Sequence, residues 1–560
     1  MPVIAPAPAV IVRLAPNGTI ALRCPFADRD RAKSVAGWHW HKASKTWRYP
    51  ATADTLRSLR TAFPGALVDP AVLEVIRGAE VRQREIDRIK VGSASDNSWP
   101  VRLPLYEHQC RAASLALAAP AFGFWMEQGT GKTAAAIAAA GRRFLDEEIL
   151  HCLVVCPKSV MPVWASEFAR FADFPYTLSV LDGPVSDRES TLQFSGGHGL
   201  RVAVVNYEAT WRMEDALRRF VQGQMIVADE CHRIKTPSAK QAKAMHRLGR
   251  AATYRLALTG TPITQSPLDL YSEYKFLDPT IFGPSYYTFR NRYAVMGGYG
   301  GHEVINYQNL DELTDKAYRI AYRVTRAECL DLPPELSQTI PVTLSPRTRS
   351  LYDELRRNAV ATLEGQATVT TVNVLAEILR LQQITGGHIG TDEGETLSVG
   401  SEKHDACLDL LRDLLSDERR KVVVFCRFRA EIGCLAAALN EVRDGLTGVL
   451  DGQTRERGEL VRRFQEDQLP RVLVVQVQTG GLGITLHRAD TAVFFSTGWS
   501  LADYEQAKAR IQRAGQAAER VQYIHLAASG TIDETIYRAL AEKRDLAVAV
   551  TEGWRTVLEG

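Results

Sequence analysis

The sequence predicts an α/β fold with two parallel-sheet lobes, helical insertions between them, and a small N-terminal α+β domain. Short apolar runs of strand length recur along the chain and alternate with helical or loop patterns, which is typical of a parallel sheet covered by helices. These runs form two series, separated by a long segment of different character. A chain of 560 residues also exceeds what one hydrophobic core usually holds, so several folding units are expected.

The N-terminal domain, expected over residues 1–78, interleaves cations with aromatic side chains. The formal net charge of the chain is only +3, yet residues 1–60 hold ten Lys and Arg against three Asp and Glu. The aromatic residues among them are Phe26, Trp38, Trp40, Trp47 and Tyr49. This mixture suits a nucleic-acid surface, where amines meet phosphates and rings stack on bases. It equally suits a small domain with a tryptophan core and a solvated charged face, and the two interpretations are compatible.

A linker is expected over residues 79–102, with a charged helical segment at Ala79–Lys90 and a polar stretch after it. The first lobe is expected over residues 103–275. Its predicted strands, each a short apolar run, are Leu153–Cys156, Val202–Val205, Met225–Ala228 and Arg255–Leu258. The sequence therefore predicts a parallel sheet in this lobe.

Residues 276–400 are expected to hold helical insertions and the connection between the lobes. From Pro267 to Gln383 the sequence is aromatic-rich, then helical, and shows no regular strand pattern. The second lobe is expected over residues 401–545, and residues 546–560 form a C-terminal tail. The strands predicted for the second lobe are Lys421–Phe425, Val472–Val475 and Thr491–Phe495.

A glycine-rich loop at Met126–Thr133 is the first motif that carries chemistry. Gly129 and Gly131 let the backbone curl so that its N–H groups face a triphosphate, and Lys132 neutralises the outer phosphates. Thr133 offers a hydroxyl to Mg²⁺. The spacing is one glycine short of the full phosphate-loop pattern, so the plain alternative is a turn between a strand and a helix.

An acidic pair, Asp229 and Glu230, follows the apolar run Met225–Ala228. A buried strand there would deliver both carboxylates to one place, where Asp229 can hold the Mg²⁺ shell and Glu230 can polarise the attacking water. Acidic pairs after strands are common, so neither motif decides alone. In this order, the two together indicate NTP hydrolysis.

The composition is that of a globular protein, with 45% hydrophobic and 24% charged residues. There is no uninterrupted apolar run of membrane-spanning length, and the N-terminus lacks the basic start of a signal peptide. Nine cysteines occur without a Cys-x-x-Cys pair, which favours a reducing compartment over a zinc site or a disulfide framework. We expect no membrane partner.

Further blocks occur in an order that identifies a family. They are Leu105–Gln109, Val155–Ser159, Val205–Glu208, Leu258–Ile263 and Leu332–Pro334, then Gln478–Leu486, Trp499–Ser500 and Gln506–Gln516. Each is weak alone, but together they resemble the SNF2-type members of helicase superfamily 2, DNA-dependent ATPases built from two RecA-like lobes. The resemblance covers most of the chain, from Leu103 to Ile536.

The resemblance implies roles for individual residues. Gln109 would read the adenine, and Thr133 and Asp229 would bind Mg²⁺. The residues implied to bind ATP are Gln109, Gly129, Thr130, Gly131, Lys132, Thr133, Gly483 and Gln516. The residues implied to contact DNA are Lys158, Ser159, Asn206, Thr479 and Trp499.

Two arginines of the last block, Arg510 and Arg513, are three residues apart, so on a helix they would face the same way. The resemblance implies that they reach across the cleft and stabilise charge on the departing γ-phosphate, an effect worth about 10³–10⁵ in rate. Two solvated arginines on a surface helix are the alternative. The catalytic set is thus Lys132, Asp229, Glu230, Arg510 and Arg513.

The implied activity is ATP-dependent translocation on duplex DNA, which would remodel protein–DNA complexes or branched and forked DNA, for example in DNA repair. Contacts would be mainly to phosphates, and the protein would act as a monomer. The segment Gly37–Tyr49 resembles the small accessory domain of SMARCAL-type annealing helicases. Large chromatin-reading modules have no room in the sequence, so nucleosome remodelling is not expected. The location implied is the bacterial cytoplasm or nucleoid, or a virus-infected cell, and the nucleus if the host is a eukaryote.

Some positions depart from the family pattern. Cys231 stands where the family usually has Ala or Gly, and Thr130 where it has Leu. Leu501 and Gln512 also differ, which leaves the subfamily open. Two alternatives remain: a strand-separating superfamily 2 helicase acting on DNA or RNA, and a non-enzymatic DNA-binding scaffold, which would require the catalytic groups to be absent.

Overall fold

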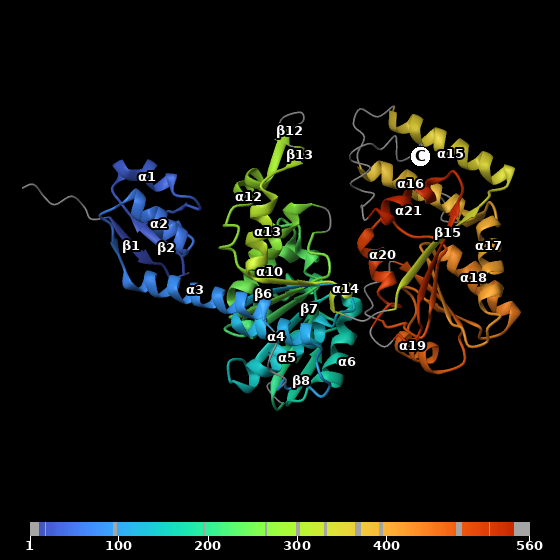
Figure 1. The fold of residues 1–560 in the computed structure, drawn as a ribbon, viewed down its shortest axis with the longest axis horizontal. Coiled ribbons are helices and arrows are strands. Elements are labelled where there is room, and N and C mark those ends of the chain that lie inside the picture. Colours follow the sequence, from blue (N-terminus) through green and yellow to red (C-terminus); the bar gives the residue numbers. More distant parts are fainter. Residues whose placement is uncertain are drawn as a thin grey trace, which may run out of the picture. The chain divides into compact units, whose positions relative to one another are not determined.

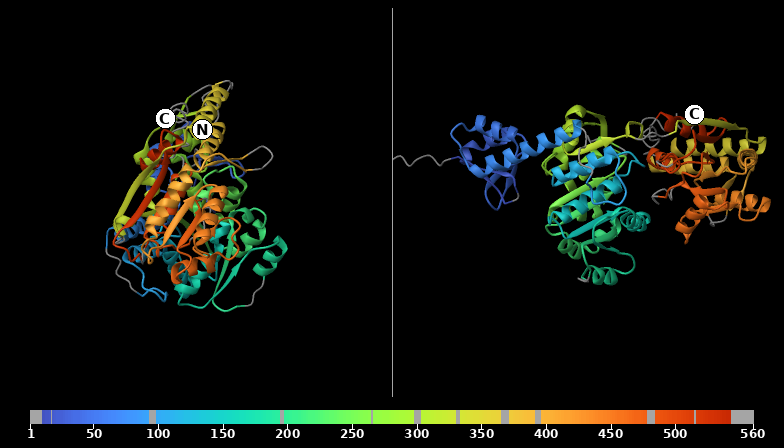
Figure 2. Two further views of the ribbon diagram at one scale, coloured as in Figure 1. Left: turned by 90° about the vertical axis from the view of Figure 1, so that its right-hand side faces the viewer. Right: turned by 60° about the horizontal axis from the view of Figure 1, so that its bottom comes forward.

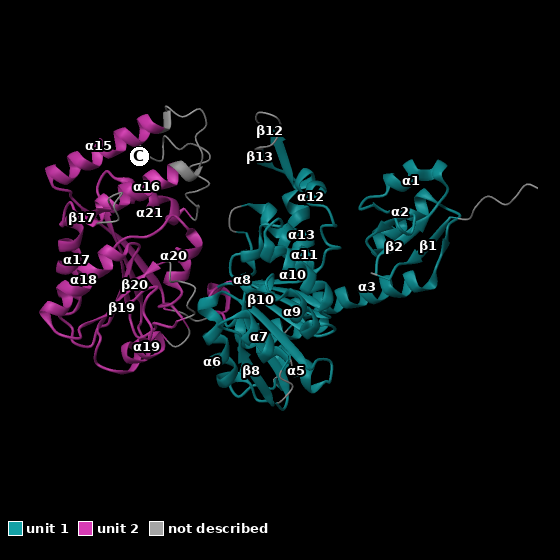
Figure 3. Ribbon diagram, turned by 180° about the vertical axis from the view of Figure 1, so that it is seen from behind, with its two compact units in different colours: residues 1–127, 131–324 teal, residues 128–130, 325–560 magenta. Residues whose placement is uncertain are grey.

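The structure is a computed structural model. It describes residues 10–16, 18–92, 98–193, 197–263, 266–297, 303–329, 333–364, 371–390, 396–477, 484–513 and 516–542. The chain divides into two compact units (Figure 3). Unit 1 comprises residues 1–127 and 131–324, and unit 2 comprises residues 128–130 and 325–560.

Unit 1 begins with a small mixed sheet in the order β3-β4-β2-β1-β5, blue in Figure 1. Only the β1–β5 pair is parallel. Its strands are β1 Ile11–Leu14, β2 Ile20–Arg23, β3 His39–His41, β4 Thr46–Tyr49 and β5 Leu67–Val68. Its helices are α1 Arg29–Ser34, α2 Ala53–Ala62 and α3 Pro70–Val91, after the 3₁₀ turn Phe26–Asp28. The core includes the fully buried side chains of Ile20, Leu22 and Tyr49.

Local signals explain where the helices of this domain begin. The Thr52 side chain accepts a hydrogen bond from the backbone N–H of Thr55 at the start of α2. Asp69 caps α3 in the same way, and Pro70 occupies its first turn. Helix α3 then continues without a break past residue 78, so the predicted domain limit falls inside a helix. The domain limits given above stay predictions.

The first lobe is a seven-stranded, wholly parallel sheet in the order β14-β6-β11-β10-β7-β9-β8. Its strands are β6 Ala121–Met126, β7 His151–Cys156, β8 Tyr176–Val180, β9 Leu200–Asn206, β10 Met225–Asp229, β11 Tyr254–Leu258 and β14 Ala321–Val324. A hairpin of β12 Ala294–Gly297 and β13 Glu303–Tyr307 lies outside this sheet.

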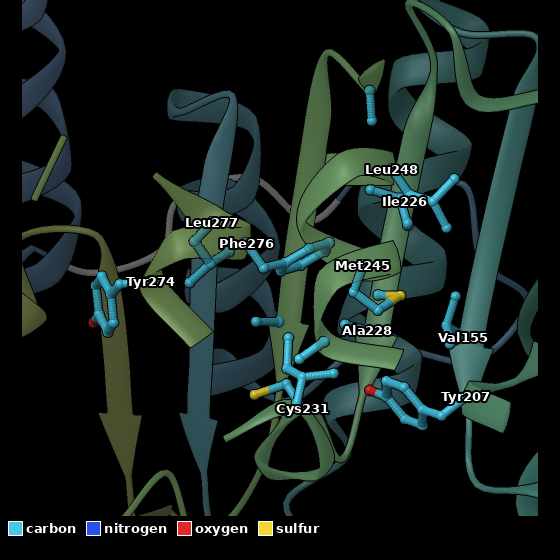
Figure 4. Close-up of a cluster of buried hydrophobic side chains, with 14 of the residues drawn as sticks. Val155, Tyr207, Ile226, Ala228, Cys231, Met245, Leu248, Tyr274, Phe276 and Leu277 are labelled. Carbon is cyan, nitrogen blue, oxygen red and sulfur yellow. The ribbon is translucent and has the colours of Figure 1, made fainter. Parts of the chain in front are cut away.

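Helices cover the first-lobe sheet and fill the insertions. They are α4 Glu107–Ala118, α5 Lys132–Leu145, α6 Met161–Phe171, α7 Val185–Gln193, α8 Tyr207–Thr210, α9 Glu214–Val221, α10 Lys240–Ala251, α11 Leu270–Leu277, α12 Tyr286–Tyr293 and α13 Leu310–Arg319. Three 3₁₀ turns accompany them, at Lys158–Val160, Cys231–Ile234 and Pro267–Asp269. Figure 4 shows Met245 and Leu248 of α10 and Phe276 of α11 beside Ile226 and Ala228 of β10.

Unit 2 contains a six-stranded parallel sheet in the order β15-β22-β21-β18-β20-β19. The strands are β15 Glu335–Val342, β18 Val422–Cys426, β19 Thr447–Leu450, β20 Val472–Gln476, β21 Thr491–Phe494 and β22 Val521–Ala528. A separate hairpin pairs β16 His388–Gly390 with β17 Thr396–Ser398.

The helices of unit 2 are α14 Arg326–Cys329, α15 Pro346–Glu364, α16 Thr371–Thr385, α17 Glu402–Leu414, α18 Arg429–Val442, α19 Arg457–Glu466, α20 Leu501–Lys508 and α21 Ile532–Ala541. Helices α15 and α16 lie side by side (Figures 1 and 2). No helix in the described part of the chain is both long and apolar enough to span a bilayer.

The predicted fold class is confirmed: two RecA-like parallel sheets and a small N-terminal mixed sheet. The expectation that Pro267–Gln383 lacks regular strands is wrong, because β14 and β15 each add an edge strand to one of the large sheets. Strand β15 is mostly exposed and polar, so it lacks the apolar run of a central strand. The predicted tail at residues 546–560 lies outside the described residues.

Candidate active site and DNA-contact residues

The candidate residues of unit 1 lie at one edge of the first-lobe sheet. The glycine-rich loop follows β6. Asp229 is the last residue of β10, and Glu230 comes directly after it. Lys158 and Asn206 stand at the ends of β7 and β9, which pair with each other. Because all these strands are parallel, their carboxyl ends meet at the same edge, where α/β proteins bind ligands.

The loop requires glycine at two positions. Gly129 and Gly131 have φ angles of +83° and +84°, in the left-handed region that side chains with a Cβ rarely adopt. A Cβ added to Gly131 would also lie 2.1 Å from Nε2 of Gln109. Helix α5 starts directly after Gly131, so its first N–H groups, which have no intrahelical partners, border the loop.

Lys132 and Gln109 are both buried beside this loop. The Lys132 ammonium donates hydrogen bonds to the main-chain oxygens of Met126 (2.9 Å) and Glu127 (3.3 Å). The Gln109 carbonyl oxygen accepts a hydrogen bond from the backbone N–H of Tyr106 (3.1 Å), which fixes the side chain at the start of α4. The structure therefore brings the predicted adenine-reading amide next to the predicted phosphate loop.

The acidic pair is buried and constrained. Asp229 Oδ1 accepts a hydrogen bond from the Glu230 N–H (3.0 Å), and Oδ2 accepts one from Nε1 of Trp164 (2.9 Å). Burial and the neighbouring Glu230 charge raise the pKa of Asp229, while Trp164 and Lys132 oppose the rise. Glu230 has a φ angle of +52°, an unusual conformation for a residue with a side chain, and such strain clusters at functional sites.

His232 and Thr259 surround the Glu230 carboxylate. His232 Nδ1 lies 3.4 Å from Glu230 Oε2 and 3.2 Å from the Thr259 hydroxyl. Burial alone would raise the pKa of Glu230, but the hydrogen bond and charge of His232, with the charges of Lys132 and Arg233, outweigh it and lower the pKa. Glu230 is therefore held ionised. The roles of His232 and Thr259 were not predicted, although Thr259 directly follows β11 at the same edge.

The predicted DNA-contact residues of unit 1 differ in exposure. Lys158 is two-thirds exposed and lies 3.4 Å from Asp182, and Ser159 is half-buried. Asn206 is only 7% exposed. Its amide donates to Glu208 (2.7 Å), and its carbonyl oxygen accepts from Arg188 (3.3 Å). Lys158 and Ser159 are thus more accessible to a ligand than Asn206.

In unit 2, the two arginines do not lie on a helix as expected. Helix α20 ends at Lys508, and tight turns follow, in which the N–H groups of Arg510 and Ile511 bond to oxygens three residues back. The chain tightens in this way as it leaves the helix. Arg513 donates a hydrogen bond to the Thr485 hydroxyl (2.8 Å), and Arg510 is buried.

The other unit 2 residues predicted to bind ATP or DNA are Gln516, Trp499, Thr479 and Gly483. The Gln516 amide donates to the main-chain oxygen of Ala489 (2.9 Å), which ties it to its own lobe. The Trp499 ring is covered on one side by the guanidinium of Arg427, 3.8 Å from the ring centroid. Thr479 and Gly483 lie outside the described residues.

Comparisons with known proteins identify the family. The SNF2-related domain family matches residues 124–387, and the helicase conserved C-terminal domain matches residues 402–515. The two matches together cover about two thirds of the chain. The chain thus combines an SNF2-related domain with a helicase conserved C-terminal domain.

Curated relatives of this SNF2-related ATPase are distant. An uncharacterized ATP-dependent helicase of Mycoplasma genitalium is 27% identical over 75% of this chain and 39% of its own length. The mouse DNA annealing helicase and endonuclease ZRANB3 is 25% identical over 77% of this chain and 39% of its own length. This chain thus spans about two fifths of the length of these relatives. The comparisons do not establish a subtype.

Two solved structures match most of this chain at low sequence identity and low TM-score. The SWI2/SNF2 ATPase core of Sulfolobus solfataricus in complex with dsDNA is 24% identical, with a TM-score of 0.40. The match covers 84% of this chain and 97% of that one. A second structure, the SWI2/SNF2 ATPase core domain of Sulfolobus solfataricus, gives a TM-score of 0.38 over 82% of this chain and 92% of that one.

Two residues that depart from the family pattern near this sheet edge are fully buried. Thr130 and Cys231 have no exposed surface. The Cys231 thiol lies against the carboxyl of Glu273 on α11, and burial raises the pKa of both groups well above their ordinary values. Cys231 is therefore a core residue and not a reactive thiol.

The N-terminal domain divides its aromatic residues between core and surface. Tyr49 is fully buried, whereas Trp38 and Trp40 are 41% and 46% exposed. Both rings contact Trp47, with centroid distances of 5.2 Å and 4.9 Å. The Lys33 ammonium lies 5.8 Å from the Trp38 ring. Tyr49 thus fits the interpretation of an aromatic core, and the nucleic-acid surface stays a prediction for the exposed Trp38 and Trp40.

Proposed function

We propose that this SNF2-related ATPase hydrolyses ATP with Mg²⁺ and uses the cycle to translocate along duplex DNA. One observation supports this best: a single sheet edge carries the glycine-rich loop, the acidic pair and both predicted DNA-contact segments. Nucleotide and nucleic acid would then be held by strands of one rigid sheet. Binding of either ligand can affect the groups that hold the other.

The residues of this edge suggest how ATP is held. The Gln109 amide reads the adenine, the N–H groups at the start of α5 face the phosphates, and Lys132 neutralises them. Glu230, held ionised by its surroundings, accepts a hydrogen bond from the attacking water and orients it. Its strained backbone supports a positioned and not merely structural role.

The donor set fits Mg²⁺. Thr133 and Asp229 offer a hydroxyl and a carboxylate oxygen, and oxygen ligands are those that Mg²⁺ prefers. The raised pKa of Asp229 reflects burial beside a second negative charge, a repulsion that a bound cation relieves. When bound, the ion would neutralise charge that develops on the phosphates.

Arg510 and Arg513 would complete the site when the lobes close on ATP. Guanidiniums suit this role because they are planar, always charged and able to bind two phosphate oxygens. Closure would then follow the presence of the γ-phosphate, and opening its loss. If DNA contacts both lobes, each cycle shifts one contact relative to the other. Gly483 and Gln516 on the nucleotide, and Thr479 and Trp499 on the DNA, remain part of this proposal.

On the DNA side, we propose contacts mainly to phosphates. Lys158 is exposed at the sheet edge, as a phosphate-binding cation must be. Such contacts are independent of sequence and weaken as salt rises. The exposed Trp38 and Trp40 would give the N-terminal domain a surface for bases at forks or branches. A relative whose name includes DNA annealing helicase is consistent with this finer proposal.

ATP hydrolysis by the whole chain with single-stranded, duplex, forked and RNA ligands at two salt concentrations tests the proposal. Duplex DNA should stimulate turnover most among unbranched ligands, and the stimulation should fall at high salt. Stimulation by RNA alone, or strand separation with a fluorescent duplex, would favour the strand-separating alternative. Turnover that no nucleic acid changes would reject the DNA proposal.

The role of the N-terminal domain needs a separate test. Trp40→Ala should lower the extra stimulation by forked over linear DNA, because base stacking is worth about 1–3 kcal/mol. Phe26→Ala is the matched control, since Phe26 is an 80% exposed aromatic residue of the same domain outside the tryptophan cluster. Equal fork preference in both variants would remove the fork proposal and leave the duplex proposal intact.

A further inference from the structure

Two buried aromatic side chains bind the same residue of the acidic pair. Nε1 of Trp164 donates to the Asp229 carboxylate at 2.9 Å, and the Tyr207 hydroxyl donates to the Asp229 main-chain oxygen at 2.7 Å. Both donors are enclosed, with exposed fractions of 1% for Trp164 and 0% for Tyr207. Figure 4 shows Tyr207 beside Ala228, the residue before Asp229 in β10. Asp229 is therefore held at its side chain and its backbone by two other segments.

These donors come from the two segments predicted to contact DNA. Trp164 lies in the first turns of α6, which follows Lys158 and Ser159 after β7. Tyr207 is the first residue of α8, directly after Asn206 at the end of β9. Each segment thus carries a polar group at the sheet edge and, a few residues later, an aromatic donor that reaches Asp229.

The surroundings make both bonds stiff. Trp164 packs against Phe168 in α6, and Tyr207 belongs to the first-lobe core. A buried N–H or O–H that loses its partner is costly, because no water replaces the bond. Close-packed interiors also transmit small displacements instead of absorbing them. A shift of α6 or α8 therefore moves Asp229 or breaks a buried hydrogen bond.

We propose that Trp164 and Tyr207 are positioning residues that couple DNA contact at the ends of β7 and β9 to the orientation of Asp229. DNA bound to Lys158 and its neighbours would set the position of α6 and α8. Through their hydrogen bonds, the two aromatic donors would transmit that displacement to the Asp229 carboxylate. DNA would thereby accelerate ATP hydrolysis. The inference rests on the proposed function, since it explains how DNA would stimulate turnover.

The test removes each donor and keeps an aromatic side chain, with a smaller phenyl ring in place of the indole at position 164. Trp164→Phe and Tyr207→Phe delete one hydrogen bond each. Two matched controls each delete a hydrogen bond of a buried aromatic side chain elsewhere in the same lobe. Trp125→Phe removes a bond to the Tyr274 hydroxyl (3.3 Å), and Tyr271→Phe removes a bond to the Pro284 oxygen (2.7 Å). Trp125 and Tyr271 are as buried as their counterparts, at 2% and 1% exposed.

The measurement is ATP turnover by the whole chain with and without saturating duplex DNA, beside DNA affinity and the KM for ATP. In Trp164→Phe the ratio of the two rates should fall about tenfold, within the usual range of coupling between sites. Tyr207→Phe should lower the ratio less, because its partner is a main-chain oxygen. DNA affinity and the KM for ATP should stay near wild type, and both controls should keep the wild-type ratio.

Other results would distinguish a failure of the coupling proposal from a failure of the proposed function. Rates that fall equally with and without DNA, or an unchanged ratio in both variants, would overturn the coupling and leave DNA stimulation intact. Controls that lose as much stimulation would also overturn it. If wild-type turnover does not respond to DNA, the proposed function itself fails. Should Trp164→Phe unfold, Tyr207→Phe decides the question alone.

Discussion

Each lobe buries a lysine beside acidic groups, and the two surroundings differ. In the first lobe, Lys132 donates to main-chain oxygens at the end of β6, near two carboxylates that repel each other. In the second lobe, Lys403 forms a 2.6 Å ion pair with Asp533, and both side chains are at most 3% exposed. Asp533 also accepts hydrogen bonds from the Thr385 hydroxyl and the Ala528 N–H.

The difference indicates two uses of buried charge. The first lobe gathers a lysine and two mutually repelling carboxylates at a sheet edge, which is expected of a site that binds an anionic ligand and a cation. In the second lobe, the Lys403–Asp533 ion pair ties α17 to α21 within one fold. Loss of Lys132 should therefore affect chemistry, and loss of Lys403 should affect stability.

The largest effect is expected from Lys403→Met. The change leaves the Asp533 carboxylate buried without its cation, which costs about 3–5 kcal/mol. Urea denaturation should show this loss in the free energy of unfolding. A second replacement, Asp533→Leu, should restore much of it, because an apolar pair avoids the buried charge. The surface pair Arg57–Asp54, 76% exposed on both sides, is the control, and breaking it should cost at most about 1 kcal/mol.

Lys132→Ala is the counterpart in the first lobe. ATP turnover should fall about 10²–10³-fold, the usual effect of removing one preorganised charge-stabilising group. The free energy of unfolding should change much less than in Lys403→Met, because the change removes a cation that donates to main-chain oxygens and leaves the Lys403–Asp533 ion pair intact. Both variants should be measured for ATP turnover and for the free energy of unfolding. If either variant lowered both quantities to the same extent, the distinction between a catalytic and a stabilising lysine would be wrong.

A buried carboxyl in the second lobe makes stability depend on pH. Burial raises the pKa of Glu431 to about 7, from an ordinary value near 4.5. The folded state thus binds this proton more tightly than the unfolded chain. The contribution is fully present below about pH 4.5 and is lost as pH rises through 7, by up to about 3 kcal/mol. Glu431→Gln should flatten this part of the stability–pH profile measured by urea denaturation.

The smallest effect concerns the loop backbone. Gly131→Ala should cost about 1–2 kcal/mol, because an alanine resists the left-handed conformation, and it should also weaken ATP binding by pushing Gln109 aside. Gly183→Ala is the control, since Gly183 has a φ angle of +93° but open space around its Cβ position. Equal KM values for ATP in the two variants would contradict the assigned place of Gln109.

The sequence predicted the central strands because they are continuous apolar runs, such as Val472–Val475 and Met225–Ala228. It missed the edge strands β8, β14, β15 and β19, whose residues are fewer or more polar, and the interior strand β22, which contains Gln522 and His525. It also placed Arg510 and Arg513 on a helix, since their spacing carries no sign that α20 ends at Lys508. Contacts such as Trp164 to Asp229 join residues 65 positions apart, and no local pattern records them.

The candidate site also contains some residues that the sequence predicts and others that only the fold reveals. The residues of the phosphate loop and the acidic pair could be predicted because their chemistry depends on short, contiguous patterns. The surroundings that tune them could not, because His232, Thr259 and Trp164 act through packing between strands. The left-handed conformation of Glu230 is likewise visible only in the fold.

Steady-state ATP turnover of wild type and Glu230→Gln, with and without duplex DNA, tests the central assignment most directly. Glu147→Gln is the control, because Glu147 also has a positive φ angle, +60°, but is exposed and away from the site. The account predicts that DNA stimulates the wild type and the control, and that Glu230→Gln loses about 10²–10³-fold in turnover while it still binds DNA. Wild-type turnover in Glu230→Gln would contradict the assignment.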